Sequence, residues 1–451
     1  MKKNREEIFE NLKPSKAVRE LALPTIIGML VMAFYNIVDT YFIAQTNDPV
    51  QVAAVSLALP VFMILMSLGN LFGIGASSNV SRNLGAKNLD VIKNITSTAF
   101  YCAIFIGILF TGMTLVGMDG LITLLGATET NANFVSGYLT LIVIGAPFII
   151  TSSTLTHIIR SEGNAKIAMF GMLLSTVVNI ACDPIFIFTL DMGVIGAALA
   201  TMIANIVSTI FYIVAILKNK NTMINLSIKN ICIKNKVLTN IVAIGTPASV
   251  TSLLTSVSTI VYNSYLNPYG SEALAAMGIV MKISLIYTMV FMGIATGIQP
   301  LLGYCYGSKK IERFKEILFY ALKVAVFIGL IFLVVIYTIS GNIISGFIDD
   351  KLIITYGTQM LRAQIVTTPI VGILYITMST MQATGKSLQA MILSVSRQGI
   401  AFIPIIFILA NTLGFEGLIW AQPLADIITL CLSIIILIIL FKSFAKEDIV
   451  G

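Results

Sequence analysis

The sequence predicts an all-α integral membrane protein with twelve transmembrane helices in two homologous six-helix bundles around a central cleft. Three observations support this fold class. The chain of 451 residues is 57% hydrophobic and only 11% charged, whereas a soluble protein carries about 25% charged residues. Twelve stretches are apolar over the roughly 20 residues that a helix needs to cross the hydrocarbon core. The second half of the chain also repeats the first.

The twelve predicted helices follow one another with short connections. A charged segment of about twenty residues precedes the first helix, which is therefore not expected to be a cleaved signal peptide. The predicted spans are 18–45, 51–80, 94–118, 132–156, 166–188, 193–217, 238–266, 272–304, 316–340, 354–380, 388–410 and 414–441.

The internal repeat divides the chain into two lobes. The segments SRNLGAKNLDVIKNI and GYCYGSKKIERFKEI align with an offset of 222 residues, which superposes Gly85 on Gly307. The same offset superposes Pro147 on Pro369. An N-terminal lobe over 1–217, a linker loop over 218–237 and a C-terminal lobe over 238–451 are therefore predicted. Because each half contains an even number of spans, the repeats are parallel and are expected to rock against each other around the cleft.

Basic residues predict the orientation of the chain in the membrane. Of the 28 Lys and Arg residues, 24 lie in the two tails and in alternate loops, beginning with Lys2, Lys3 and Arg5. The opposite loops are acidic, with Lys351 as their one clear base. The positive-inside rule therefore places both termini in the cytoplasm. The net charge of +7 follows from this topology, and its spread over many loops argues against a nucleic-acid partner.

Two carboxylates lie within apolar, membrane-length segments, Asp39 in FYNIVDTYFIA and Asp183 in TVVNIACDPIFIF. A charged group at this depth costs roughly 2.5–3.5 kcal/mol and is typical of ion or substrate pathways. Asn179 shares a helix face with Asp183 at i,i+4 spacing, and Pro184 leaves the carbonyl of Ile180 without its helical donor. Hard oxygen ligands of this kind suit a metal cation, and the same carboxylates suit a proton. The alternative is that each carboxylate caps a helix kink or pairs with a buried base.

Several of these segments resemble those of the multidrug and toxic compound extrusion (MATE) transporters, most closely the bacterial branch with an acidic N-terminal lobe. The motifs include LALPTIIGMLVMAFYNIVDTYFIA, GNLFGIGASSNVSRNLGAKN, IIRSEGNAKIAM and NIACDPIFIF followed by GVIGAALAT. The resemblance implies an exporter of bulky, often cationic organic compounds, driven by the inward flow of Na⁺ or H⁺. Carried over by position, the resemblance implies a cation-coupling site, which is also the metal site if the ion is Na⁺, formed by Asp39, Asn179, Asp183 and Thr201.

Candidate substrate contacts lie on the same predicted helices. Tyr35 is one turn from Asp39 and can stack on a flat cation, and Met172 shares the helix face of Asp183 and brings an adaptable thioether. The predicted substrate-binding residues are Tyr35, Asn36, Met172 and Thr176. His157 is the single histidine. It is interpreted as a satisfied polar residue or an inner-gate element, with a proton carrier as the alternative.

The C-terminal half has no carboxylate within the spans that correspond to helices 7 and 10. Another branch of the family places its acidic residues there, so a second ion site is not expected. Three charged residues do lie within predicted spans of this half: Lys282, Arg397 and Asp426. A structural charge network among them is predicted, with a role in substrate binding or gating as the alternative.

The sequence does not predict an enzyme. Its five cysteines form no C-x-x-C pair, one histidine is too few for a zinc set, and no Walker motif is present. No cofactor is expected beyond the coupling ion. A secondary multidrug exporter is the favoured function; the alternatives are a flippase for a lipid-linked precursor, which would need several bases in its cleft, and a passive channel. The expected partners are small-molecule drugs or toxins and membrane lipid, for a monomer in a bacterial cell membrane.

Overall fold

The structure, a computed structural model, describes residues 7–46, 48–232 and 236–450. Within these ranges the only regular secondary structure is helical. Four of the basic residues used for the topology prediction lie outside the described residues: Lys2, Lys3, Arg5 and Lys234.

The N-terminal lobe begins with a short π-helix, η1 (Glu7–Asn11), which precedes the first long helix. Its long helices are α2 (Pro14–Ala44), α3 (Pro49–Gly85), α4 (Leu89–Val116), α6 (Ala132–Ile144), α7 (Ala146–Ser161), α8 (Ala165–Pro184) and α9 (Gly193–Lys218). Two short elements complete it: α5 (Met118–Leu124) and the π-helix η2 (Ile185–Thr189), which directly continues α8.

The C-terminal lobe has a matching order of elements. Its helices are α10 (Val237–Leu266), α11 (Ser271–Gly307), α12 (Ile311–Ser345), α13 (Lys351–Ile365), α14 (Thr368–Ala383), α15 (Ser387–Val395) and α16 (Phe402–Val450). Three short elements complete the described chain: the 3₁₀ turns η3 (Ile228–Asn230) in the linker and η4 (Asn267–Tyr269), and the π-helix η5 (Ser396–Ile400).

The described residues contain twelve spans, as predicted. Nine helical segments are long and apolar enough to cross a membrane, and two bent pairs, α6 with α7 and α13 with α14, bring the number to eleven. The ninth segment, Ser387–Ala445, has 59 residues, and a straight helix of that length would reach roughly 90 Å, about three times the hydrocarbon thickness. It is divided at Gly414, whose φ of 60° and ψ of −132° are not helical. The division gives the twelfth span.

Two differences from the predicted spans bear on how the lobes pack. The spans 132–156 and 354–380 are each broken, with bends of 49° and 50° just before Pro147 and Pro369. The helices α3 and α11 also continue to Gly85 and Gly307, beyond the predicted ends at 80 and 304. Their last turns pack against each other across the lobes, since a Cβ at Gly85 would lie 2.1 Å from the Tyr304 carbonyl oxygen and one at Gly307 would lie 2.0 Å from the Arg82 carbonyl oxygen. Protein contacts, and not lipid, stabilise these turns. The length of the apolar stretch therefore predicts helices that end too early.

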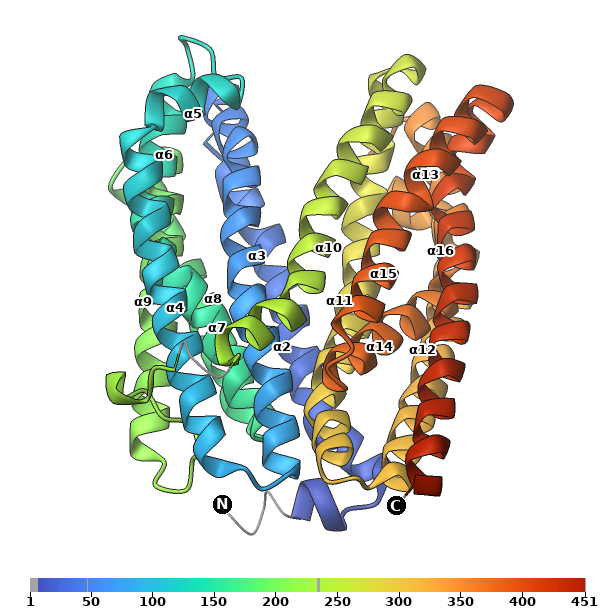
Figure 1. Ribbon diagram of the computed structural model, residues 1–451. Helices are drawn as coiled ribbons and strands as arrows, with labels where there is room; N and C mark the ends of the chain where they lie inside the picture. Colours follow the sequence, from blue (N-terminus) through green and yellow to red (C-terminus); the bar gives the residue numbers. More distant parts are fainter. Residues whose placement is uncertain (1–6, 47, 233–235, 451) are drawn as a thin grey trace.

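The two lobes stand side by side and diverge away from the chain termini (Figure 1). We refer to the side of the molecule that carries both termini as the terminal side, and to the opposite side as the distal side. The lobes meet where α3 packs on α10 and α11, and where α2 packs on α11. The chain crosses between them through the linker, which leaves α9 at Lys218 and enters α10 at Val237.

Close contacts between the lobes lie in the terminal halves of these helices. A Cβ atom at Gly75 would lie 2.0 Å from the Ile241 carbonyl oxygen, and one at Gly245 would lie 1.8 Å from the Leu71 carbonyl oxygen. The backbones therefore approach as closely as small residues allow between membrane helices. On the distal halves of α3 and α10 several large apolar side chains are exposed, as at Leu59 and Leu253. The described structure is thus sealed on its terminal side and open on its distal side.

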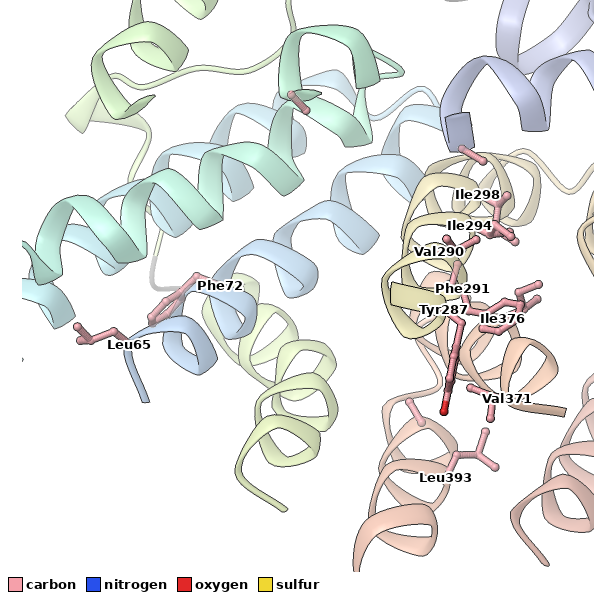
Figure 2. Packing of buried hydrophobic residues seen from close by; sticks show 14 of the residues in the cluster. Leu65, Phe72, Tyr287, Val290, Phe291, Ile294, Ile298, Val371, Ile376 and Leu393 are labelled. Carbon is pink, nitrogen blue, oxygen red and sulfur yellow. The ribbon is translucent and has the colours of Figure 1, made fainter. Parts of the chain in front are cut away.

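Buried apolar side chains hold each lobe together. Figure 2 shows Tyr287, Val290 and Phe291 of α11 close to Val371 and Ile376 of α14. The core of the C-terminal lobe therefore lies between α11 and α14. The interior of the N-terminal lobe is also largely apolar, so the polar side chains buried there are candidates for a functional site.

Candidate cation and substrate site

The N-terminal lobe contains two adjoining cavities. The larger, of about 190 Å³, lies between α2, α3, α7, α8 and α9, and Met289 and Met292 of α11 also line it. The second, of about 180 Å³, lies toward the distal end of α2 and contains Asp39. Tyr35, Asn36, Phe62 and Thr201 line both. Since about 10–15 Å³ of such space holds one water, each cavity has room for much more than a single solvent molecule.

All four predicted substrate contacts line the larger cavity: Tyr35, Asn36, Met172 and Thr176. The wall also carries a set of flexible thioethers, from Met29, Met32, Met66, Met172, Met289 and Met292. Methionine adapts to irregular apolar shapes and contacts aromatic rings favourably. The cavity wall therefore suits flat organic molecules of varied outline.

Asn179, Asp183 and Thr201 form one buried cluster between α8 and α9. Their exposures are 2%, 0% and 5%. With the amide of Asn179 oriented to satisfy both neighbours, its nitrogen donates to Asp183 Oδ2 over 2.9 Å and its oxygen accepts from the Thr201 backbone N–H over 3.1 Å. The Tyr35 hydroxyl lies 3.3 Å from Thr201 Oγ1. This contact brings α2 to the same cluster.

Asp39 and Asp183 each have one carboxylate oxygen, Oδ1, that is buried and has no hydrogen-bond partner. Neither residue takes part in an ion pair with another described residue. An unpartnered buried carboxylate oxygen is costly. The arrangement therefore leaves one acceptor open on each of the two carboxylates, as a small cation or a proton would require.

The chain around Asp183 deviates from a regular α-helix. Pro184 ends α8, and the next five residues form the π-helix η2. Single π-turns are frequent at functional sites because they widen the helix locally. Within the described residues no group of three or more His, Cys, Asp or Glu side chains is placed to hold a metal ion. A metal cation here would therefore depend on the two carboxylates together with amide and hydroxyl oxygens.

Sequence reasoning missed the terminal end of the larger cavity. Arg160, which the topology prediction treats as a loop base, is 2% exposed and lines the cavity with His157. Ser152, Thr156 and Arg160 follow one another at a spacing of four residues on α7, and all three line the cavity. The spacing alone could not have identified this wall, because α7 carries further Ser and Thr residues outside these positions.

The predicted network of the C-terminal lobe is present only in part. Arg397 Nε lies 2.9 Å from Asp426 Oδ1, and the guanidinium lies over the Tyr375 ring, 5.1 Å from its centroid. Placing Lys282 in this network is wrong, because its side chain is exposed. The helix that carries it, α11, turns this position away from the lobe core.

Comparisons with known proteins agree with this architecture. The sequence profile of the MatE family matches residues 24–185 and again 247–408. The two matches are displaced by 223 residues, so each half of the chain carries one copy of the family unit. This displacement agrees with the repeat seen in the sequence.

Curated relatives cover nearly the whole chain. The multidrug export protein MepA of Staphylococcus saprophyticus is 33% identical over 441 residues, which are 98% of this chain and 97% of that protein. MepA of Staphylococcus aureus is 34% identical over 444 residues, with the same two coverages.

Solved structures resemble the fold closely. An outward-facing multidrug resistance MATE family transporter has a TM-score of 0.91 and 26% identity, covering 96% of this chain and 97% of that one. A MATE transporter in complex with MaL6 has a TM-score of 0.93 and 25% identity, covering 98% and 99%. With a family profile in both halves and relatives of matching length, this chain belongs to the MatE family of membrane transporters.

Proposed function

We propose that this chain is a secondary multidrug exporter that moves bulky organic cations outward in exchange for Na⁺ or H⁺ entering the cell. Members of its family are transporters and not enzymes. The relatives it matches over nearly their full length are named multidrug export proteins. No cofactor beyond the transported ion is needed.

One observation carries the proposal. Asp39, with one open carboxylate oxygen, lines the second cavity, and Asp183, with another, accepts a hydrogen bond from Asn179, which lines the larger cavity. Tyr35 and Thr201 belong to both the cavity wall and the polar cluster. An ion bound at the carboxylates therefore acts on the same side chains that a substrate contacts.

This shared wall supports competition between ion and drug. Binding of Na⁺ or H⁺ neutralises the carboxylates, and α2, which contains Pro24, then repacks against α9. A cationic drug loses its counter-charge and its space in the same step. Entry of one cation across a potential of 100 mV releases about 2.3 kcal/mol, and exclusive binding couples that energy to export.

The positive-inside rule supports a cytoplasmic terminal side, and the distal side then faces outward. The open distal side corresponds in this orientation to an outward-facing state. We assign the protein to the cell membrane of a bacterium, working as a monomer surrounded by lipid.

The experiment is ethidium efflux from proteoliposomes under an imposed Na⁺ gradient or an imposed pH gradient, each alone. Wild-type protein is expected to transport with one of the two, and Asp183→Asn is expected to lose transport by about a hundredfold while remaining monodisperse. Asp119→Asn, which removes an exposed carboxylate from the same lobe, is the matched control and is expected to retain activity. Wild-type efflux by Asp183→Asn would disprove the role of the carboxylate.

A flippase for a lipid-linked precursor is not favoured. A pyrophosphate head group calls for several bases, and Arg160 is the single Lys or Arg among the residues that line the larger cavity. Its wall is otherwise polar, aromatic and rich in methionine.

A further inference from the structure

The larger cavity has a buried guanidinium at its terminal end. Arg160 is among the largest fully buried side chains of the described structure, with an exposure of 2%. Its Nε and Nη1 atoms have no hydrogen-bond partner, although the side chain lines the cavity. A guanidinium is permanently charged and presents N–H donors in a planar fork. Donors of this kind are rarely left unused in a protein interior.

No acidic side chain of the cavity wall neutralises this charge. The residues that line the larger cavity include neither Asp nor Glu. The nearest acidic neighbour in sequence, Glu162, uses its carboxylate to accept from the Met223 N–H and the Thr222 hydroxyl. A buried charge without a partner is strongly unfavourable. The cavity is therefore ready to receive a negative group at this end.

The larger cavity and the second cavity that adjoins it carry opposite charges, because Arg160 lines the first and Asp39 lines the second. Along α7 the wall runs from Ile149 to Arg160, and eleven residues of helix rise by roughly 16 Å. Thr201, which contacts the carboxylate cluster, and Tyr212, near Arg160, lie equally far apart on α9. A molecule that spans this length and reaches past Thr201 into the second cavity can place a cation near Asp39 and an anion at Arg160.

We propose that Arg160 is the receptor for an anionic group, such as a carboxylate, on zwitterionic organic substrates of this transporter. The proposal rests on the exporter function and deepens it, because it names a substrate class. A planar carboxylate matches the guanidinium fork in two parallel hydrogen bonds. His157, one turn earlier on α7 and also lining the cavity, lies on the same side of the bound group. A substrate without the anion would leave the buried donors unpaired, which penalises it relative to the zwitterion.

The test compares two dyes that differ only at the anionic group, rhodamine B with its free carboxylate and rhodamine B methyl ester. Their binding to purified full-length protein is measured by fluorescence anisotropy. For Arg160→Gln we expect rhodamine B affinity to fall about tenfold to a hundredfold, the range for a hydrogen bond to a charged group. Ester affinity is expected to change less than about threefold. Arg160→Lys, which keeps the charge but loses the fork, is expected to fall between wild type and Arg160→Gln.

Lys166→Gln is the matched control, because it removes an exposed base of the same lobe that pairs with Glu20. It is expected to leave the affinities of both dyes unchanged. Equal losses for dye and ester in Arg160→Gln would overturn the proposal and indicate a structural role. An unchanged rhodamine B affinity would overturn it as well. If Arg160→Gln does not distinguish the two dyes while the wild type still exports ethidium, this inference fails and the exporter function stands; if the wild type exports no ethidium under either gradient, the exporter function fails.

Discussion

At the scale of single residues, Asp426 shows how a buried charge is stabilised in the C-terminal lobe. It is 2% exposed and accepts hydrogen bonds from Arg397 Nε (2.9 Å), Gln422 Nε2 (3.1 Å) and Thr367 Oγ1 (3.2 Å). Both carboxylate oxygens are thus satisfied by protein groups. Asp39 and Asp183 differ from it, because each keeps one carboxylate oxygen without a partner. The difference supports a structural role for Asp426 and an ion-binding role for Asp39 and Asp183.

This contrast predicts the effect of Asp426→Asn. The substitution leaves the Arg397 guanidinium buried without its counter-charge, so the free energy of unfolding should fall by about 3–5 kcal/mol. Thermal unfolding of the detergent-purified protein measures it. Lys282→Gln, at the exposed lysine, is the control and should unfold like the wild type. An Asp426→Asn protein that is equally stable but inactive in dye efflux would assign the pair to transport instead.

At this scale, the sequence identifies those charged residues whose burial in the membrane would cost most. Asp39, Asp183, Arg397 and Asp426 could be identified because a charge inside an apolar span is rare. Arg160 could not, since its position near the end of a span is equally typical of a loop base. Whether such a residue faces lipid headgroups or a cavity depends on the packing of α7.

At the scale of elements, the π-helix η1 connects the two lobes on the terminal side. Phe9 is fully buried and stacks on the Tyr304 ring of α11 at 4.8 Å between centroids. A Cβ at Gly163, in the N-terminal lobe, would lie 3.0 Å from the Phe9 ring. Arg313 donates to the carbonyl oxygens of Phe9 (2.8 Å) and Leu12 (2.7 Å). The segment therefore fastens the seal between the lobes.

Glu10 makes this attachment sensitive to acid. Its carboxylate accepts from the Tyr304 hydroxyl and pairs with Lys310 at 3.2 Å. The hydrogen bond from Tyr304, and then the Lys310 charge, hold the pKa of Glu10 below its usual value. A lowered folded-state pKa means that the stabilisation is complete above the unfolded value of about 4.3 and is lost as pH falls through the folded value.

Glu10→Gln is accordingly expected to lower the thermal stability of the purified protein at neutral pH. The difference from wild type should stay constant down to about pH 5 and shrink below about pH 4, where the wild-type carboxylate is itself protonated. Glu7→Gln changes an exposed acid in the same segment and should have little effect. If Glu10→Gln is still less stable than wild type by the same amount at about pH 3, the charge of Glu10 is not what stabilises the contact between η1 and the C-terminal lobe.

The sequence predicts which helices are present better than it predicts where they bend. The repeated Pro147 and Pro369 are visible in the sequence, but the bends of 49° and 50° that precede them are not. Each bend is accommodated by a glycine on the neighbouring helix, since a Cβ at Gly107 or Gly329 would lie 2.5 Å from the Cα of the corresponding proline. These contacts join residues about forty positions apart and cannot be read from local patterns.

At the scale of the whole molecule, the repeat explains why the lobes close so tightly on one side. The helix pairs that join them, α3 with α10 and α2 with α11, are equivalent under the internal repeat. Both pairs approach through glycine, at Gly75 and Gly245 in the first and at Gly293 and Gly297 in the second. The number of spans, the two lobes and the family could be predicted from the sequence. The sealed side could not, because both conformations of a rocking transporter must be compatible with one sequence.

A reversible cross-link tests whether this seal must open during transport. Ser67 of α3 and Ser249 of α10 each donate to the backbone carbonyl of the other, over 3.2 and 2.8 Å, so cysteines at both positions come within disulfide reach. In a background whose five native cysteines are replaced, oxidation of Ser67→Cys/Ser249→Cys is expected to form the bond in most molecules and to abolish ethidium efflux. A reductant should restore it. Leu59→Cys/Val257→Cys, on the open distal halves of the same helices, should cross-link far more slowly in the resting protein. A bonded 67–249 protein that still transports would show that the lobes need not separate on the terminal side, and alternating access by rocking would then be wrong for this chain.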